Sequence, residues 1–241
     1  NCLSDYISIL VLTHNIDELD DAGWTALCYA CYYNHNYSNS NVVKLLIDLG
    51  ANLIAGSAKN FSPLILACYN TNKISSEKTI EILLEAGKRT NCLEKMLSIK
   101  CGGGWSALMR SVKNIRNKGR IEIPLMLIDA GSDVNEKNNE GDYILHIICQ
   151  NNHINNDKIL IALLEAGAKI NIIATHGNNV GRSALHIACM NNCFSKIKIL
   201  MMYGANTTIK DNNGFTADHY CNDVQKYIII NKFFTNDDIF K

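Results

Sequence analysis

Residues 181–204, GRSALHIACMNNCFSKIKILMMYG, combine two short patterns that recur along the chain. The first is Gly-x-Thr/Ser-x-Leu, and the second is an aliphatic run that ends at a glycine. With two degenerate copies, the first recurs as GWTAL (23–27), NFSPL (60–64), GWSAL (104–108), GDYIL (141–145), GRSAL (181–185) and GFTAD (214–218). The second recurs as VVKLLIDLG (42–50), TIEILLEAG (79–87), IPLMLIDAG (123–131), ILIALLEAG (159–167) and KIKILMMYG (196–204). Because the two patterns alternate without exception, they predict a chain of repeated units.

Each copy of the first pattern predicts the start of a helix. A Thr or Ser hydroxyl before an apolar run can accept a hydrogen bond from a free backbone N–H of the first turn. Helices are therefore expected to begin at Thr25, Ser62, Ser106, Ser183 and Thr216. Pro63 suits a first helical position, where its missing N–H costs nothing. In the fourth copy Tyr143 occupies the capping position, so that helix is expected to start less cleanly.

The second pattern predicts a second helix in each unit, because its apolar residues fall at i, i+3 and i+4. The glycines that close the runs suit left-handed helix C-caps; they are Gly50, Gly87, Gly131, Gly167 and Gly204. Each unit is thus predicted to be a helix, a turn, a second helix and an extended connection. The connection after Gly87 is long and contains Cys101-Gly102-Gly103-Gly104, which indicates a flexible finger tip.

These units resemble the ankyrin repeat family. The resemblance rests on the family motif D-x-x-G-x-T-P-L-H-x-A-A…V-V-x-L-L-L-x-x-G-A-D-V-N, matched by GSDVN (131–135), LLEAGAKIN (163–171) and GRSALHIAC (181–189), and it extends from Asp20 to Thr216. It implies an all-α fold, an ankyrin-repeat solenoid of stacked helix-turn-helix units with projecting hairpin fingers. It also implies a concave face that binds other proteins.

The resemblance predicts a single ankyrin-repeat domain over residues 1–241. Its expected parts are a truncated repeat (1–19), full repeats at 20–53, 57–92, 101–135, 138–171 and 178–207, and a C-terminal capping repeat (211–241) with a closing helix from Val224 to Phe240. Only the last interval between copies of the first pattern, from Gly181 to Gly214, equals the ankyrin period of 33 residues. Four repeats carry extra residues between their two helices.

In its lengthened turns and its abundance of Asn, Ile and Lys, the chain resembles ankyrin proteins of giant DNA viruses of amoebae (mimivirus-like). Ankyrin proteins of poxviruses are the alternative, although their F-box-like segment is not recognisable in KYIIINKFFTNDDIFK (226–241). The chain begins at Asn1 rather than Met, so we expect a fragment or a trimmed chain.

Charge and hydropathy exclude several classes of protein. The chain carries 23 basic and 23 acidic residues and has no net charge, which argues against a general nucleic-acid binder and against capture by acidic membranes. No apolar run approaches the roughly 20 residues of a membrane-spanning helix. We expect no nucleic-acid or membrane partner, and a monomer in the cytoplasm, or in the host cytoplasm if the source is viral.

The chain has ten cysteines, which could indicate a disulfide framework or buried thiols. Four of them occupy the same inner position of the first helix in different repeats, namely Cys31, Cys68, Cys149 and Cys189. Stacked helices lie about 8–10 Å apart, whereas a disulfide needs Cα atoms within about 6.8 Å. Buried free thiols, typical of a reducing compartment, are therefore expected.

Three pairs have the spacing of zinc ligands: Cys28-x-x-Cys31, His146-x-x-Cys149 and His186-x-x-Cys189. Structural zinc needs four converging ligands, whereas these pairs belong to separate layers. The resemblance implies that His146, His186 and His219 form hydrogen bonds between repeats, so a core role is favoured over metal binding. The chain has no catalytic motif such as G-x-S-x-G, H-E-x-x-H or a P-loop. We expect no metal, no other cofactor and no enzymatic activity.

An aromatic row is the candidate binding site. The residue after each starting position faces the concave side in this family; along the chain it is Trp24, Phe61, Trp105, Asp142, Arg182 and Phe215. Nearby first-helix positions carry Tyr32, Tyr33 and Tyr69, and in later repeats Lys113, Gln150 and Met190. The predicted partner-binding residues are Trp24, Tyr32, Tyr33, Phe61, Tyr69, Trp105 and Arg182, with Asp142 and Arg182 forming a polar rim. Alternatively, the rings pack on neighbouring fingers.

We therefore expect a non-catalytic scaffold that binds an unidentified protein, possibly of a host, through its concave face. The alternative is the substrate-recognition part of a ubiquitin-ligase adaptor whose effector segment lies outside this chain.

Overall fold

Helix pairs joined by extended fingers make up the structure, a computed structural model that describes residues 15–21, 23–33, 37–56, 59–69, 76–115, 121–151, 156–222 and 226. Within these ranges the regular structure is helical, and extended segments meet only in isolated β-bridges. The expected all-α repeat architecture is confirmed. Contacts divide the chain into unit 1, Asn1–Asp133, and unit 2, Val134–Lys241.

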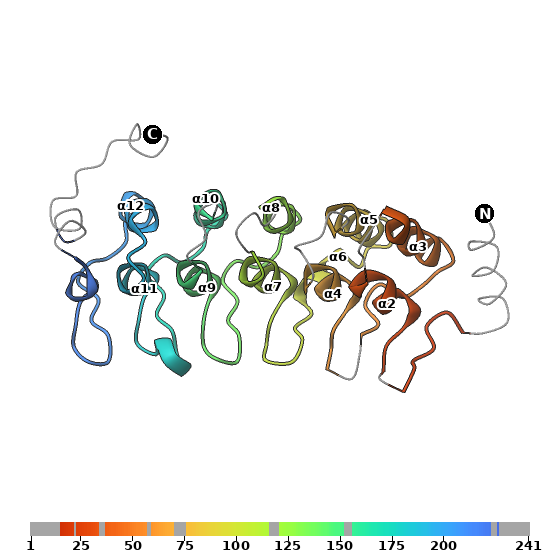
Figure 1. Cartoon of the computed structure of the whole chain (residues 1–241), viewed down its shortest axis with the longest axis horizontal. Helices are drawn as coiled ribbons and strands as arrows, with labels where there is room; N and C mark the ends of the chain where they lie inside the picture. Colours follow the sequence, from red (N-terminus) through yellow and green to blue (C-terminus); the bar gives the residue numbers. More distant parts are fainter. Residues whose placement is uncertain are drawn as a thin grey trace. The chain divides into compact units, whose positions relative to one another are not determined.

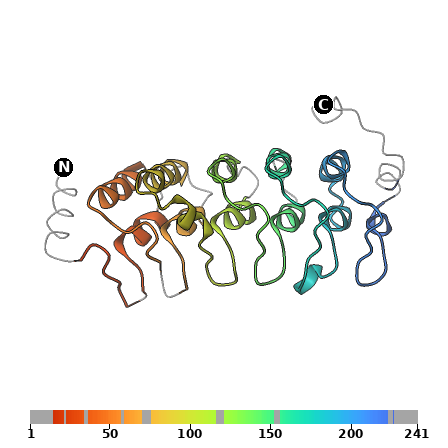
Figure 2. The same cartoon turned by 180° about the vertical axis from the view of Figure 1, so that it is seen from behind.

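Unit 1 has an inner and an outer layer of helices (Figure 1). The inner helices are α2 (Ala26–Tyr32), α4 (Pro63–Tyr69) and α7 (Ala107–Lys113). The outer helices are α3 (Tyr37–Asp48), α5 (Ser76–Arg89) and α8 (Glu122–Asp129). Helix α4 contacts both α2 and α7, and α5 contacts both α3 and α8. The fingers project from the inner layer, away from the outer helices, as the view from behind also shows (Figure 2).

The expected caps set the start of the inner helices in unit 1. The Thr25 hydroxyl accepts a hydrogen bond from the Cys28 backbone N–H at 3.2 Å. The Ser62 hydroxyl accepts from Ile65 at 3.4 Å, and the Ser106 hydroxyl accepts from Met109 at 3.3 Å. Each bond satisfies an N–H group that has no partner within its helix. The predicted helix starts are therefore confirmed at these positions.

Apolar side chains from both layers form the core of unit 1. The leucine of the first pattern is buried in each copy, as Leu27, Leu64 and Leu108. Outer helices contribute the fully buried Ile80 and Leu83, and Ile123 and Leu127. Because each such side chain contributes roughly 1.5–3 kcal/mol when removed from water, the repeating apolar positions hold the layers together.

The connection after Gly87 differs from the sequence expectation. Helix α5 continues through Gly87 to Arg89, and a further helix, α6 (Leu93–Ser98), follows it. Met96 of α6 is fully buried, and α6 contacts α5. A Cβ at Gly87 would lie only 2.6 Å from the Met96 sulfur, so the glycine permits close packing of α6 rather than ending the helix. The predicted left-handed cap at Gly87 is wrong; the other four predicted cap glycines have φ between +84° and +93°. The flexibility of the tip at 101–104 stays a prediction, and Cys101 and Trp105 form an isolated β-bridge there.

Unit 2 has the same two layers. Its inner elements are α9 (Ile144–Gln150), α11 (Ala184–Met190) and the short 3-10 helix η2 (Ala217–Tyr220). Its outer helices are α10 (Asp157–Glu165) and α12 (Phe194–Met202), and one finger contains the 3-10 turn η1 (Gly177–Asn179). Helix α11 contacts α9, α12 and η2, while α10 contacts α12. The predicted starts after Ser183 and Thr216 are confirmed.

Helix α9 begins at the expected position even though Tyr143 replaces Thr or Ser. The backbone N–H of Tyr143 donates to His146 Nδ1 at 3.0 Å, and the backbone carbonyl of Tyr143 accepts from His146 and Ile147. The histidine of the third helical position thus closes the first turn, and the expectation of a less clean start is wrong.

A buried lysine links two repeats of unit 2. Lys196 in α12 is 2% exposed, and its Nζ donates to the carbonyl oxygens of Ile148, at 2.7 Å, and of Asn151. These carbonyls lie at the end of α9, where the negative end of the helix dipole favours a cation. Lysine therefore replaces an aliphatic residue here without leaving its charge unsatisfied.

The predicted repeat boundaries stay a prediction, and parts of them lie outside the described residues. These parts are most of the truncated repeat at 1–19 and, apart from Lys226, the closing helix from Val224 to Phe240.

Candidate protein-binding site

Four aromatic side chains and one leucine of unit 1 surround a groove of about 180 Å³. Its lining residues are Trp24, Tyr32, Phe61, Leu66 and Tyr69. Trp24 and Phe61 directly precede the capping residues Thr25 and Ser62, so the caps fix both rings at the inner helix starts. The helices α2 and α4 supply the other three side chains. We call this feature the aromatic groove.

The rings of the aromatic groove contact one another across two repeats. Trp24 and Tyr32 meet edge to face with centroids 5.3 Å apart, and Phe61 and Tyr69 do so at 6.3 Å. Tyr32 and Tyr69 join the two repeats at 6.3 Å. These separations fall in the range of favourable aromatic pairs. The structure therefore brings together four of the predicted partner-binding residues.

Two further tyrosines extend the aromatic surface beyond the groove. Tyr33 is 52% exposed and packs edge to face on Tyr32 at 5.0 Å. Tyr29, which the sequence reasoning missed, stacks on Tyr33 and lies 5.1 Å from Trp24. Its hydroxyl donates to Asp20, and this hydrogen bond raises the pKa of the phenol. The sequence contains a signal for Tyr29, because Tyr29 and Tyr33 are four residues apart and therefore share one helix face.

Trp105 is largely buried, with 9% of its surface exposed. The guanidinium of Arg110 lies over it, with Cζ 4.8 Å from the indole centre, and also lies 5.4 Å from the centre of the Tyr69 ring. Burial and this contact agree with the alternative that the indole packs within the stack. Arg110 was also missed; it occupies the same place in its repeat as Tyr29, six residues after the starting glycine.

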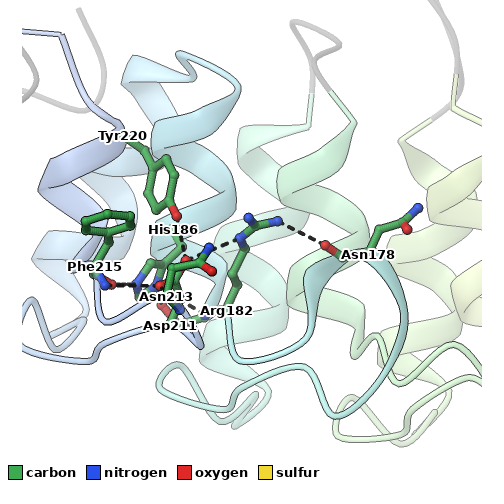
Figure 3. Close-up of polar contacts among 8 residues, drawn as sticks. Asn178, Arg182, His186, Asp211, Asn213, Phe215 and Tyr220 are labelled. Carbon is green, nitrogen blue, oxygen red and sulfur yellow. Dashed lines mark hydrogen bonds and ion pairs between the residues drawn. The ribbon is translucent and has the colours of Figure 1, made fainter.

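Arg182 belongs to unit 2 and takes part in a network of its own (Figure 3). Its Nε is 3.7 Å from the Asp211 carboxylate, and its Nη1 donates to the Asn178 carbonyl at 2.9 Å. Burial raises the pKa of Asp211, but hydrogen bonds from the Tyr220 hydroxyl and from the backbone of Phe215 and Asn213 outweigh it, so the net shift is downward. The ionised carboxylate of Asp211 thus holds Arg182 between two fingers. A role of Arg182 in partner binding stays a prediction.

The expected polar rim at Asp142 is wrong. Asp142 is only 6% exposed, and its carboxylate accepts hydrogen bonds from Asn179, at 2.9 Å, and from Gln150. The finger that contains η1 covers this side chain, so Asp142 serves packing between fingers.

His146 and His186 connect successive repeats, as the family resemblance implies. Nε2 of His146 is 3.2 Å from the Ile172 carbonyl, and Nε2 of His186 is 3.2 Å from the Phe215 carbonyl. Their Nδ1 atoms accept from the backbone N–H of Tyr143 and Ser183, so the ring proton lies on Nε2. Burial lowers the pKa of both, which keeps them neutral. His219 differs, because it is exposed and stacks on Phe215 with centroids 3.8 Å apart.

The chemistry of the thiols and imidazoles favours core roles. Cys31, Cys68, Cys149 and Cys189 are fully buried, and burial raises the pKa of Cys149 to about 12. Across the described ranges no cluster of three or more His, Cys, Asp or Glu side chains could hold a metal ion. Every helix in this part of the chain is too short or too polar to span a membrane.

A second groove of about 420 Å³ lies between α3 and α5 on the outer layer of unit 1. Charged side chains such as Lys44, Glu85 and Arg89 line it, and Arg89 pairs with Asp48 at 3.6 Å. These exposed charges contrast with the aromatic groove on the inner layer.

Comparisons with known proteins agree with this architecture. A family profile described as ankyrin repeats (3 copies) matches residues 2–94, 38–138 and 108–211. Among solved structures, the ankyrin repeat domain of Bcl-3, described as a unique member of the IkappaB protein family, is 21% identical with a TM-score of 0.74, covering 95% of this chain and 90% of that one. The ankyrin repeat domain of human ASB11 is 18% identical with a TM-score of 0.68, covering 95% and 92%.

A third structure, an ankyrin repeat domain from Acinetobacter baumannii AYE, is 26% identical with a TM-score of 0.67, covering 84% of this chain and 94% of that one. No curated protein sequence matches the chain.

Proposed function

Since the chain belongs to the ankyrin repeat family, we propose that it is a non-catalytic scaffold that binds a partner protein at the aromatic groove of unit 1. The observation that carries this proposal is the groove itself, an apolar hollow formed by Trp24, Tyr32, Phe61, Leu66 and Tyr69. Domains of this family generally bind proteins, and the groove lies on the side formed by the inner helices and fingers.

Physical chemistry supports this choice of surface. Tyr69, which lines the groove, is 41% exposed, and Tyr33, which packs beside it on Tyr32, is 52% exposed, so neither ring lies singly on the surface. Contiguous exposed apolar surface is typical of interaction sites. Trp and Tyr are also enriched among the residues that contribute most to binding. The groove has room for one bulky apolar side chain of a partner.

Site-specific photo-crosslinking tests the location. A p-benzoylphenylalanine at position 33 replaces an exposed tyrosine beside the groove, and the matched control replaces Tyr203, which is 38% exposed in unit 2. We expect the first position, and not the second, to capture a protein from a cell lysate. Equal capture at both positions, or none at position 33, would contradict the proposal.

The captured partner then permits a measurement of affinity. Trp24→Ala should weaken binding by about 2 kcal/mol, or roughly thirtyfold in Kd, since it removes one wall of the groove. Isothermal titration calorimetry measures the Kd, and circular dichroism checks that the variant stays folded. An unchanged Kd in a folded variant would place the interface elsewhere.

The substrate-recognition role in a ubiquitin-ligase adaptor is the alternative, and it would use the same face with an effector segment outside this chain. The lengthened turns and the Asn-, Ile- and Lys-rich composition support a source in a giant DNA virus of amoebae, and free buried cysteines support a cytoplasmic location.

A further inference from the structure

Arg110 of α7 lies against two aromatic rings at the edge of the aromatic groove. Its guanidinium carbon is 4.8 Å from the Trp105 ring centre and 5.4 Å from the Tyr69 ring centre. Contacts of this kind orient a guanidinium and leave its charge intact. Because Tyr69 also lines the groove, one ring is shared by the apolar hollow and the cation.

No carboxylate of the described residues lies within ion-pairing distance of this guanidinium. The ion pairs seen between two described residues of unit 1 are Lys78–Glu81 and Arg89–Asp48, and neither involves Arg110. Among the described residues, Nη2 of Arg110 donates only to the Cys101 sulfur, at 3.6 Å, and Nε is buried without an acceptor. A sulfur is a weak acceptor, and poorly satisfied donors on a charged group are unfavourable. Arg110 therefore retains capacity to bind an anionic group.

We propose that the partner presents an extended segment in which a bulky apolar side chain enters the aromatic groove and a carboxylate binds Arg110. This inference rests on the proposed function and adds the chemistry of the segment. A guanidinium and a carboxylate match in geometry and form paired charge-assisted hydrogen bonds. Trp, Tyr and Arg are the residue types that dominate binding energy when they cluster, and all three meet here.

The shared ring fixes the spacing between the two anchors. An extended chain advances about 3.3 Å per residue, and the guanidinium carbon lies 5.4 Å from the centre of Tyr69. The acidic residue is thus expected within about one to three positions of the apolar residue.

The sign of the charge follows from the same surroundings. A basic residue in the segment would be repelled by Arg110, which already occupies a face of Tyr69 and of Trp105. Asp20, in the first finger, accepts hydrogen bonds from the Trp24 backbone N–H at 2.8 Å and from the Tyr29 hydroxyl. Its charge is therefore engaged within the protein.

A phage-displayed library of random twelve-residue peptides, selected on the whole chain, tests the proposal. We expect enrichment of sequences that place Asp or Glu within three positions of Leu, Ile, Met, Phe or Trp. Enriched peptides without acidic residues, or with basic ones, would overturn the proposed carboxylate contact. If no enriched peptide binds at the aromatic groove, this result would instead count against the proposed function.

Variants then assign the contact to Arg110. Arg110→Gln should weaken binding of an enriched peptide about tenfold, which corresponds to about 1.4 kcal/mol, and should remove the preference for Glu over Gln in that peptide. The matched control, Arg89→Gln, removes an arginine of the outer layer and should leave the Kd unchanged. Trp24→Ala should weaken the Glu and Gln peptides equally, because it acts on the groove alone.

A measurement on the unaltered protein keeps the test valid if Arg110→Gln unfolds. Raising the ionic strength screens partly exposed charges, so the Kd of the Glu peptide should rise with salt while that of its Gln counterpart stays constant. Equal salt dependence of the two peptides would overturn the contact between Arg110 and a carboxylate.

Discussion

His186 joins two successive repeats because its buried imidazole bonds both its own helix start and the carbonyl of Phe215 in the next finger. Burial lowers its pKa below the ordinary value near 6.5. Between the folded and unfolded pKa values, the unfolded chain binds more protons. The contribution of His186 to the free energy of unfolding is therefore fully present above about pH 6.5 and declines as the pH falls toward the folded pKa. His146 should add to this trend in the same direction.

Urea unfolding at pH 7.5 and pH 5 measures this loss. We expect His186→Gln to be less stable at pH 7.5 and to lose less stability on acidification than the unaltered protein. His219→Gln is the matched control, because His219 lies exposed at the corresponding place of its repeat. A pH dependence that His186→Gln leaves unchanged would show that other groups dominate it.

Helix α6 is the element whose packing depends most on a single backbone position. In an exposed helix interior, Gly→Ala adds up to about 1 kcal/mol of stability. At Gly87 the added methyl would lie 2.6 Å from the sulfur of Met96, which is fully buried. We therefore expect Gly87→Ala to destabilise the protein by about 1–3 kcal/mol through overpacking, as measured by urea unfolding.

A double-mutant cycle supplies the control. In a Met96→Ala background the contact with the sulfur is gone and the nearest atom to the methyl is Leu93 Cα at 3.3 Å, so Gly87→Ala should cost clearly less stability than in the unaltered protein. If Gly87→Ala has the same effect in both backgrounds, the contact between α5 and α6 does not explain the glycine.

The regular elements could be predicted from the sequence because their signals are local and repeat in frame. Thr25, Ser62 and Ser106 cap their helices through bonds to residues three positions away, so the amino-acid pattern carries the geometry. Helix α6 could not be found in the same way, since it occurs in one repeat. Leu93, Met96 and Leu97 have the i, i+3, i+4 spacing that is typical of a helix, but the glycines that follow them indicate a loop.

The candidate site was predictable only in part, for the same reason. Trp24 and Phe61 occupy the same position in their repeats, so the repeat pattern predicts an aromatic row. Whether a ring lines a groove or packs inward depends on its neighbours, and Trp105 packs inward. The place of Arg110 depends on rings from two repeats, which no local pattern specifies.

At the scale of the whole molecule, the two units contain separate sets of buried thiols. Unit 1 contains Cys28, Cys31, Cys68 and Cys101, and unit 2 contains Cys149, Cys189 and Cys221. Burial raises the pKa of Cys31, Cys68 and Cys149. The thiolate is the reactive form, so these cysteines should react with a thiol reagent only after local or global unfolding. Cys92 and Cys193 are half-buried and should react first.

This separation makes thiol labelling a measure of how cooperatively the chain unfolds. Repeats contact mainly their neighbours, so a weakened interface should open nearby repeats before distant ones. His186→Ala removes a bond between repeats of unit 2 and should speed labelling of Cys149, Cys189 and Cys221 more than labelling of the cysteines of unit 1. Pulse labelling followed by mass spectrometry of peptides resolves the two sets of cysteines. In a separate measurement, all ten cysteines should label in denaturant without reductant. Equal acceleration in both units would mean that the chain opens as one cooperative body, and protected cysteines in denaturant would reveal disulfides instead.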